Sequence, residues 1–177
     1  MSDAETRRGR SHLQYAIALL LDLLGAAGAL LVSLPTWQAI TVARHDLTGV
    51  TVDMTGRDVD SASTALGLVA LAGVVAVLAT RGLWRRVVGG VLALAGLGLI
   101  WRSSAAAGAV GSARARSFVE GHRQTFTVDA GVMPHIAVHA VWPVLSVVCG
   151  VLVLASGVLV AARGGRWQAM SARYEAA

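Results

Sequence analysis

Charged residues are scarce in this sequence. Asp, Glu, Lys and Arg make up 14% of the 177 residues, and lysine is missing altogether. A soluble domain carries about a quarter charged residues, because its surface must be solvated. Hydrophobic residues reach 55%, and the mean hydropathy is +0.65. The composition therefore predicts an integral membrane protein with the lipid bilayer as its main solvent.

Cysteine is nearly absent as well. Cys149 is the only cysteine of the chain, and it lies inside an apolar run. A single cysteine excludes an intramolecular disulfide, and it also excludes the cysteine patterns of zinc and haem sites.

Common catalytic signatures are missing too. The sequence contains no HExxH, no GxSxG and no phosphate-binding P-loop, the motifs that would point to hydrolytic or nucleotide chemistry. The glycine-rich segment GGVLALAGLG (89–98) follows no strand and precedes no lysine, so helix packing explains it better. We expect no enzyme, no metal and no cofactor.

Basic charge is present, but its distribution does not favour nucleic acid. The net charge is +5, and all 15 basic residues are arginine. A nucleic-acid surface gathers basic residues along one solvated face, with stacking aromatic residues between them. Here the arginines lie in clumps between apolar runs. This placement is typical of membrane flanks, and we expect no nucleic-acid partner.

Four apolar stretches approach the length of a membrane-spanning helix, which is about 20 residues. The expected spans are about 14–34, 63–81, 87–106 and 141–162. The first span follows a basic segment, as a cleaved signal peptide does, but its apolar run exceeds the roughly 7 to 15 residues of such a core. The sequence predicts a membrane all-α fold, a four-transmembrane-helix bundle forming a single integral membrane domain, 1–177.

Small residues recur at one-turn intervals within these spans, where they let helix backbones approach closely in lipid. They are Gly25, Ala29, Gly73, Gly89, Ala93, Gly96, Ser146 and Gly150. Such faces serve folding within one chain and self-association equally well, so a homo-oligomer stays open.

Arginine placement predicts the orientation of the chain, because short cytoplasmic loops carry the Lys/Arg excess. Nine arginines fall in the N-terminal segment, the loop between spans two and three, and the C-terminal tail. The other two loops, 35–62 and 107–140, together with Arg102 near the end of the third span, hold six arginines that are offset by six acidic residues. We therefore expect both termini to be cytoplasmic and these two loops to be outer loops.

The first outer loop contains a predicted β-hairpin. Residues 37–44 are rich in Thr, Ile and Val, residues 45–49 supply a turn, and residues 50–54 alternate between apolar and polar. Period-two alternation around a glycine-containing turn is typical of a hairpin. RQTFTVDAG (123–131) is a candidate third strand. Because three strands persist where a lone hairpin is marginal, we expect a small extracytoplasmic β-hairpin or β-cap seated on the helices.

Asp22 lies near the middle of the first span. An aspartate at that depth costs about 2.5 to 3.5 kcal/mol on insertion, and an intramembrane carboxyl is a functional-site candidate by default. The structural alternative is a protonated acid between helices, hydrogen-bonded to a serine hydroxyl or a backbone carbonyl. No basic residue falls at its depth to form an ion pair.

Histidine and tryptophan side chains have simpler interpretations. His135 and His139 stand four residues apart at the mouth of the fourth span, on one face if the helix has begun there. No third ligand follows at a fixed spacing, so interfacial histidines explain them better than a metal site. Tryptophan prefers the membrane–water interface. That preference accounts for all five tryptophans, Trp37, Trp84, Trp101, Trp142 and Trp167, which fall near predicted membrane edges.

The C-terminal tail RWQAMSARYE (166–175), after a last span opened by Trp142 and Pro143, carries a family resemblance. Pro35 and Trp37 after the first span, TGRD (55–58) and the 81–86 loop fit as well. The chain resembles the tryptophan-biosynthesis-associated membrane proteins of actinobacteria, a Trp operon-associated four-span family. The resemblance implies four spans in a bacterial plasma membrane and genes placed among tryptophan-synthesis genes. It carries over no catalytic residue.

Three functional hypotheses follow. The first is a non-enzymatic membrane protein, accessory to tryptophan biosynthesis or aromatic amino-acid metabolism, that binds a cytoplasmic or membrane protein partner. Its candidate docking tail contains Arg166, Trp167, Met170, Arg173 and Tyr174. The alternative is a small transporter component for an aromatic amino acid or precursor that uses Asp22. The third is a sensor that uses the outer β-cap.

Overall fold

The computed structural model describes residues 3–42, 50–107, 117 and 135–164 of the chain. Its long helices are α1 (Asp3–Val32), α3 (Ser61–Ala79), α4 (Leu83–Ala107) and α7 (Val141–Arg163). The strands are β1 (Thr36–Val42), β2 (Val50–Thr55) and β3 (His135–Val138), and the short helix α2 (Gly56–Val59) follows β2.

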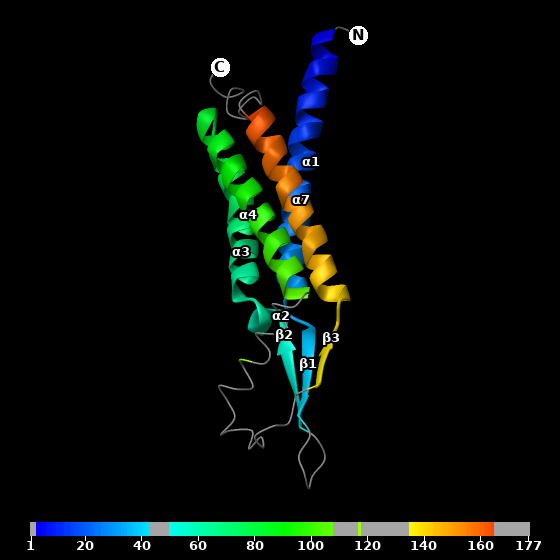
Figure 1. Cartoon of the computed structure of the whole chain (residues 1–177). Coiled ribbons are helices and arrows are strands. Elements are labelled where there is room, and N and C mark those ends of the chain that lie inside the picture. Colours follow the sequence, from blue (N-terminus) through cyan, green and yellow to red (C-terminus); the bar gives the residue numbers. More distant parts are fainter. Residues whose placement is uncertain (1–2, 43–49, 108–116, 118–134, 165–177) are drawn as a thin grey trace.

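The long helices lie side by side in a bundle (Figure 1). The first turn of α1 and the last turn of α7 lie at one end of this bundle, the termini end, and the sheet lies at the other, the sheet end. Helix α7 packs against α1 and α4, and α3 packs against the same two helices. Neighbouring helices are therefore antiparallel, as in up-and-down bundles.

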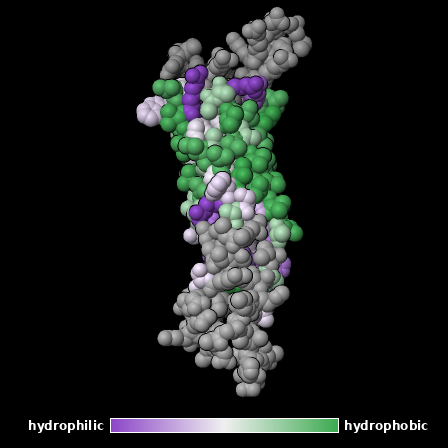
Figure 2. Space-filling view, in the orientation of Figure 1, coloured by the Kyte–Doolittle hydropathy of each residue, from purple (hydrophilic) through white to green (hydrophobic). Residues whose placement is uncertain are grey.

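The four expected spans correspond to the four long helices. The segments long and apolar enough to cross a membrane are Leu13–Val32, Ser61–Ala79, Leu83–Ala106 and Val141–Arg163. The prediction is confirmed within a few residues, except that α4 begins four residues before the expected third span. Apolar side chains cover the outside of the bundle (Figure 2). Leu94, for example, is 70% exposed, and lipid is the solvent that accepts such a surface.

Glycine allows the closest helix contact, which joins α4 to α7. A Cβ atom added to Gly89 would collide with the backbone of Ala161, and one added to Gly157 would collide with the backbone of Ala93. Dispersion contacts drive helix association in lipid, so this close approach stabilises the pair. It confirms the packing role predicted for Gly89 and Ala93.

The sheet has the strand order β2, β1, β3, with both pairings antiparallel. The register of β1 and β2 pairs Val42 with Val50, which confirms the predicted hairpin. The segment 123–131, the expected third strand, lies outside the described residues. The third strand of the structure is β3, which leads into α7.

A small apolar core seats the sheet on the bundle. Its buried members are Trp37, Ile40, Met54, Val59 and Ala106, and Val32 and Trp142 pack against them. The Trp37 side chain is 1% exposed, and its Nε1 donates a hydrogen bond of 2.8 Å to the Val32 carbonyl. The prediction that this indole faces the membrane interface is therefore wrong, because it anchors the sheet to the end of α1.

Candidate functional site

Asp22 is the buried carboxyl of the bundle core. It lies on the buried stripe of α1 with Ala18, Gly25 and Ala26, and its side chain is 1% exposed. One turn further along, a Cβ atom at Gly25 would come within 2.8 Å of Val153 on α7. The carboxyl therefore lies at the level where α1 packs most closely on α7.

The Asp22 carboxyl makes none of the hydrogen bonds that the structural alternative expects. Neither carboxyl oxygen has a hydrogen-bond partner among the described residues. The Ser156 hydroxyl of α7 is not its partner, because it donates to the Ala18 carbonyl at 2.8 Å, one turn before Asp22. An ionised carboxylate in this position would be uncompensated, and burying an unpaired charge is far more costly than burying a neutral acid.

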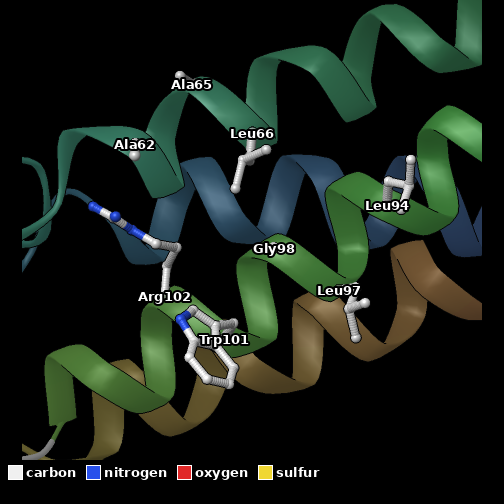
Figure 3. A pocket seen from close by; sticks show the side chains of 8 residues that line it. All are labelled: Ala62, Ala65, Leu66, Leu94, Leu97, Gly98, Trp101 and Arg102. Carbon is white, nitrogen blue, oxygen red and sulfur yellow. The ribbon is translucent and has the colours of Figure 1, made fainter.

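Two grooves lie between α3 and α4, and neither reaches Asp22. The larger one, of about 610 Å³, is lined by Ala62, Ala65, Leu66, Leu94, Leu97, Gly98, Trp101 and Arg102. The smaller one, of about 210 Å³, is lined by Val69, Ala72, Gly73, Ala76, Val87, Val88, Val91 and Leu92. Figure 3 shows the larger groove between the two helices, with Arg102 extending along one end of it. These walls accept apolar molecules, and the carboxyl of Asp22 is not part of them.

A polar network at the sheet end joins α3 to α4. Arg102 forms a salt bridge with Asp60, and its Nε also donates to Asp60 at 3.1 Å. The Ser63 hydroxyl donates to the same carboxylate at 2.6 Å. Asp60 is 2% exposed, so a bidentate arginine supplies the charge that a buried carboxylate requires.

Sequence reasoning missed this network. Asp60 and Arg102 are separated by 42 positions. From the sequence, each was counted only as a charge on the outer side of the membrane. A usable signal existed, since Asp60 directly precedes an apolar helix at the position where aspartate caps helices. Its partner could not be identified without knowing that α3 and α4 are adjacent.

The termini end of the bundle is rich in arginine. The side chains of Arg81, Arg86 and Arg163 are exposed, and hydrophilic side chains gather there above the apolar band in Figure 2. Arg85 is different, because it is 5% exposed and its guanidinium lies 5.4 Å from the centre of the Tyr15 ring. This end therefore presents positive charge both on its surface and between its helices.

The predicted docking residues Arg166, Trp167, Met170, Arg173 and Tyr174 lie outside the described residues. The two histidines do not share a helix face, because His135 is in β3 and α7 begins at Val141. The condition for a shared helix face is therefore not met, because residues 135–138 pair with β1 as a strand. Within the described part of the chain, no three His, Cys, Asp or Glu residues gather as metal ligands would.

Comparison with known proteins gives one family. A family profile described as tryptophan-associated transmembrane protein matches residues 19–177. A search of curated proteins finds no matching sequence. The match covers the second half of α1, the whole of α3, α4 and α7, and the whole of the described sheet. The chain belongs to the tryptophan-associated transmembrane protein family.

Proposed function

We propose that this transmembrane protein is a non-enzymatic accessory of tryptophan biosynthesis that docks a soluble protein on the termini end of its bundle. The family description associates it with tryptophan. We place it in the bacterial plasma membrane, with the termini end in the cytosol, where amino-acid biosynthetic enzymes work. In this arrangement the protein holds its partner at the membrane and takes no part in the chemistry.

The observation that carries the proposal is the arginine surface of the termini end. Arg81, Arg86 and Arg163 are exposed there, and the positive-inside rule assigns such a surface to the cytosol. Positive patches steer acidic partners and increase their association rate. The tail residues Arg166, Trp167, Met170, Arg173 and Tyr174 extend the same chemistry, since arginine and aromatic residues dominate the energetics of protein interfaces.

The experiment measures partner binding to the full chain in mild detergent. The soluble enzymes of tryptophan synthesis from the same organism are purified and tested singly by biolayer interferometry. We expect one of them to bind, and to lose at least about tenfold in affinity, or about 1.4 kcal/mol, with the double variant Arg81→Glu/Arg86→Glu. Deletion of residues 166–177 should weaken binding as well.

A matched control separates docking from general charge effects. Arg57 is exposed at the sheet end, so Arg57→Glu makes the same charge change on the opposite side of the bundle. Binding should stay within about twofold of wild type, because a distant exposed charge is screened beyond a Debye length of about 10 Å. Equal losses with Arg57→Glu, or no binding by any of the enzymes, would contradict the proposal.

Transport of an aromatic amino acid is the second candidate function. It is supported by Asp22, a buried carboxyl with no hydrogen-bond partner in the described part of the chain. Its test is tryptophan flux into proteoliposomes that contain wild-type or Asp22→Asn protein. Transport requires a flux above that of empty liposomes, and a loss of that flux in the variant. Flux equal to the empty liposomes excludes this function without affecting the docking proposal.

A further inference from the structure

Arg85 lies where α4 begins, α7 ends and the apolar span of α1 starts. It is in the first turn of α4, and its guanidinium lies 5.4 Å from the Tyr15 ring centre on α1. Its aliphatic stem lies against the end of α7, since a Cβ atom at Gly164 would come within 3.1 Å of its Cγ and Cδ atoms. The side chain is 5% exposed. These contacts define a buried site formed by Tyr15, Arg85 and Gly164, which we name the Arg85 site.

The guanidinium of the Arg85 site has no anionic partner in the described part of the chain. Its Nε is buried and makes no hydrogen bond there, and the salt bridge at the sheet end belongs to Arg102 and Asp60. The Tyr15 ring and the carbonyl end of α7 attract a cation, but neither neutralises its charge. A buried arginine with an open donor and no counter-ion is suited to bind an anion.

The depth of the Arg85 site in the bundle indicates which class of anion could reach it. Tyr15, Arg85 and Gly164 each lie within a few residues of the ends of the spans Leu13–Val32, Leu83–Ala106 and Val141–Arg163. The ends of membrane spans meet the headgroup region, where lipid phosphates lie. The neighbouring Trp84 is 72% exposed, as expected of an indole at that level.

We propose that the Arg85 site binds the phosphate of an anionic phospholipid from the surrounding leaflet. Arginine presents planar, paired donors that match two phosphate oxygens, and basic pockets between membrane helices select anionic headgroups. The exposed Arg81, Arg86 and Arg163 favour lipids with net negative charge around the site. This site goes beyond the docking proposal, because it uses the buried arginine and a lipid in place of the exposed arginines and a protein.

The test is native mass spectrometry of the full chain in detergent, titrated separately with dioleoyl-phosphatidylglycerol and dioleoyl-phosphatidylcholine. Wild type should bind phosphatidylglycerol at least about tenfold more tightly than phosphatidylcholine. Arg85→Gln should abolish most of this preference, since it removes the charge but keeps a side chain of similar length. Arg57→Gln is the matched control, because Arg57 is exposed at the opposite, sheet end of the bundle, and the affinity of this variant should stay within about twofold of wild type.

Three results would overturn the proposal. They are equal affinity of the wild type for the two lipids, equal losses with Arg85→Gln and Arg57→Gln, and complete displacement of phosphatidylglycerol by millimolar inorganic phosphate. The last result would assign the site to free phosphate.

Wild-type protein provides a second measurement that does not depend on the folding of a variant. Phosphatidylglycerol with a photoactivatable headgroup should crosslink to the peptides that contain Tyr15 or Gly164. Crosslinks confined to the sheet end would also contradict the proposal.

Discussion

Ser156 on α7 donates a 2.8 Å hydrogen bond to the backbone carbonyl of Ala18 on α1, one helical turn before Asp22. This bond joins the two helices through a polar contact that leaves the aspartate untouched. Interhelical hydrogen bonds in membranes contribute about 0.6 kcal/mol on average. The stability of this region therefore rests mainly on close packing, and Asp22 adds a cost to it.

Removing the carboxyl should stabilise the bundle. Asp22→Ala eliminates a buried polar group that has no hydrogen-bond partner among the described residues. An unpaired buried polar group costs on the order of 1 to 3 kcal/mol, and the small cavity offsets part of the gain. We expect the free energy of unfolding to rise by about 1 kcal/mol in a detergent unfolding titration. A decrease of that size would show that the carboxyl has a stabilising partner, such as a bound water or ion.

Breaking the Asp60 network should destabilise the sheet end. Arg102→Leu removes the salt bridge and the 3.1 Å hydrogen bond from a carboxylate that is 2% exposed. Hydrogen bonds to charged groups contribute about 1.5 to 3 kcal/mol, and the partial exposure of Arg102 favours the lower end. The unfolding titration should show a loss of about 2 kcal/mol.

Adding Asp60→Asn to Arg102→Leu provides the control for this network, because it removes the uncompensated charge as well. The double variant should recover part of the stability lost by the single one. If the two losses simply add, the residues are energetically independent, and the network is not what holds α3 to α4.

Two neighbouring glycines, Gly89 and Gly90, should differ in how strongly a substitution by valine lowers the stability. Gly89→Val places a side chain against the backbone of α7 at Ala161, whereas Gly90 has open space around its added Cβ atom. Overpacking typically costs about 1 to 3 kcal/mol, so Gly89→Val should lower the thermal midpoint clearly and Gly90→Val should leave it nearly unchanged. Similar effects at both positions would contradict the close α4 and α7 packing.

The indole nitrogen of Trp37 should matter more than that of an exposed tryptophan. Trp37→Phe removes the 2.8 Å hydrogen bond to the Val32 carbonyl, which is part-buried, and the loss should cost about 1 kcal/mol. Trp84→Phe is the matched control, since Trp84 is 72% exposed. Equal thermal stability of the two variants would mean that Trp37 does not anchor the sheet.

The sequence was sufficient to predict the helices and the hairpin, because both depend on local patterns. Apolar length located the four spans, and period-two alternation located β1 and β2. The environment of Trp37 was not predictable in this way, since a tryptophan at a span edge has the same local sequence whether it faces lipid or packs beneath a sheet.

The polar contacts depend on long-range packing, and the sequence left them open. The Asp60 and Arg102 pair requires α3 beside α4, and the Arg85 site requires α1 to pass beside the start of α4 and the end of α7. β3 was missed because four residues give too short a pattern. Asp22 was conspicuous in the sequence as an aspartate in the middle of an apolar span, and the structure buries it in the bundle.

The central claim is that the arginine-bearing termini end faces the cytosol, and cysteine accessibility in intact cells tests it most directly. Single cysteines are introduced by Ser2→Cys, Ala177→Cys or Thr51→Cys, each in a Cys149→Ala background, and are treated with a membrane-impermeant maleimide. We predict that Thr51→Cys, in the exposed part of β2, reacts in intact cells, and that the two terminal positions react only after permeabilisation. Labelling of either terminus in intact cells, with protection of Thr51→Cys, would contradict the account.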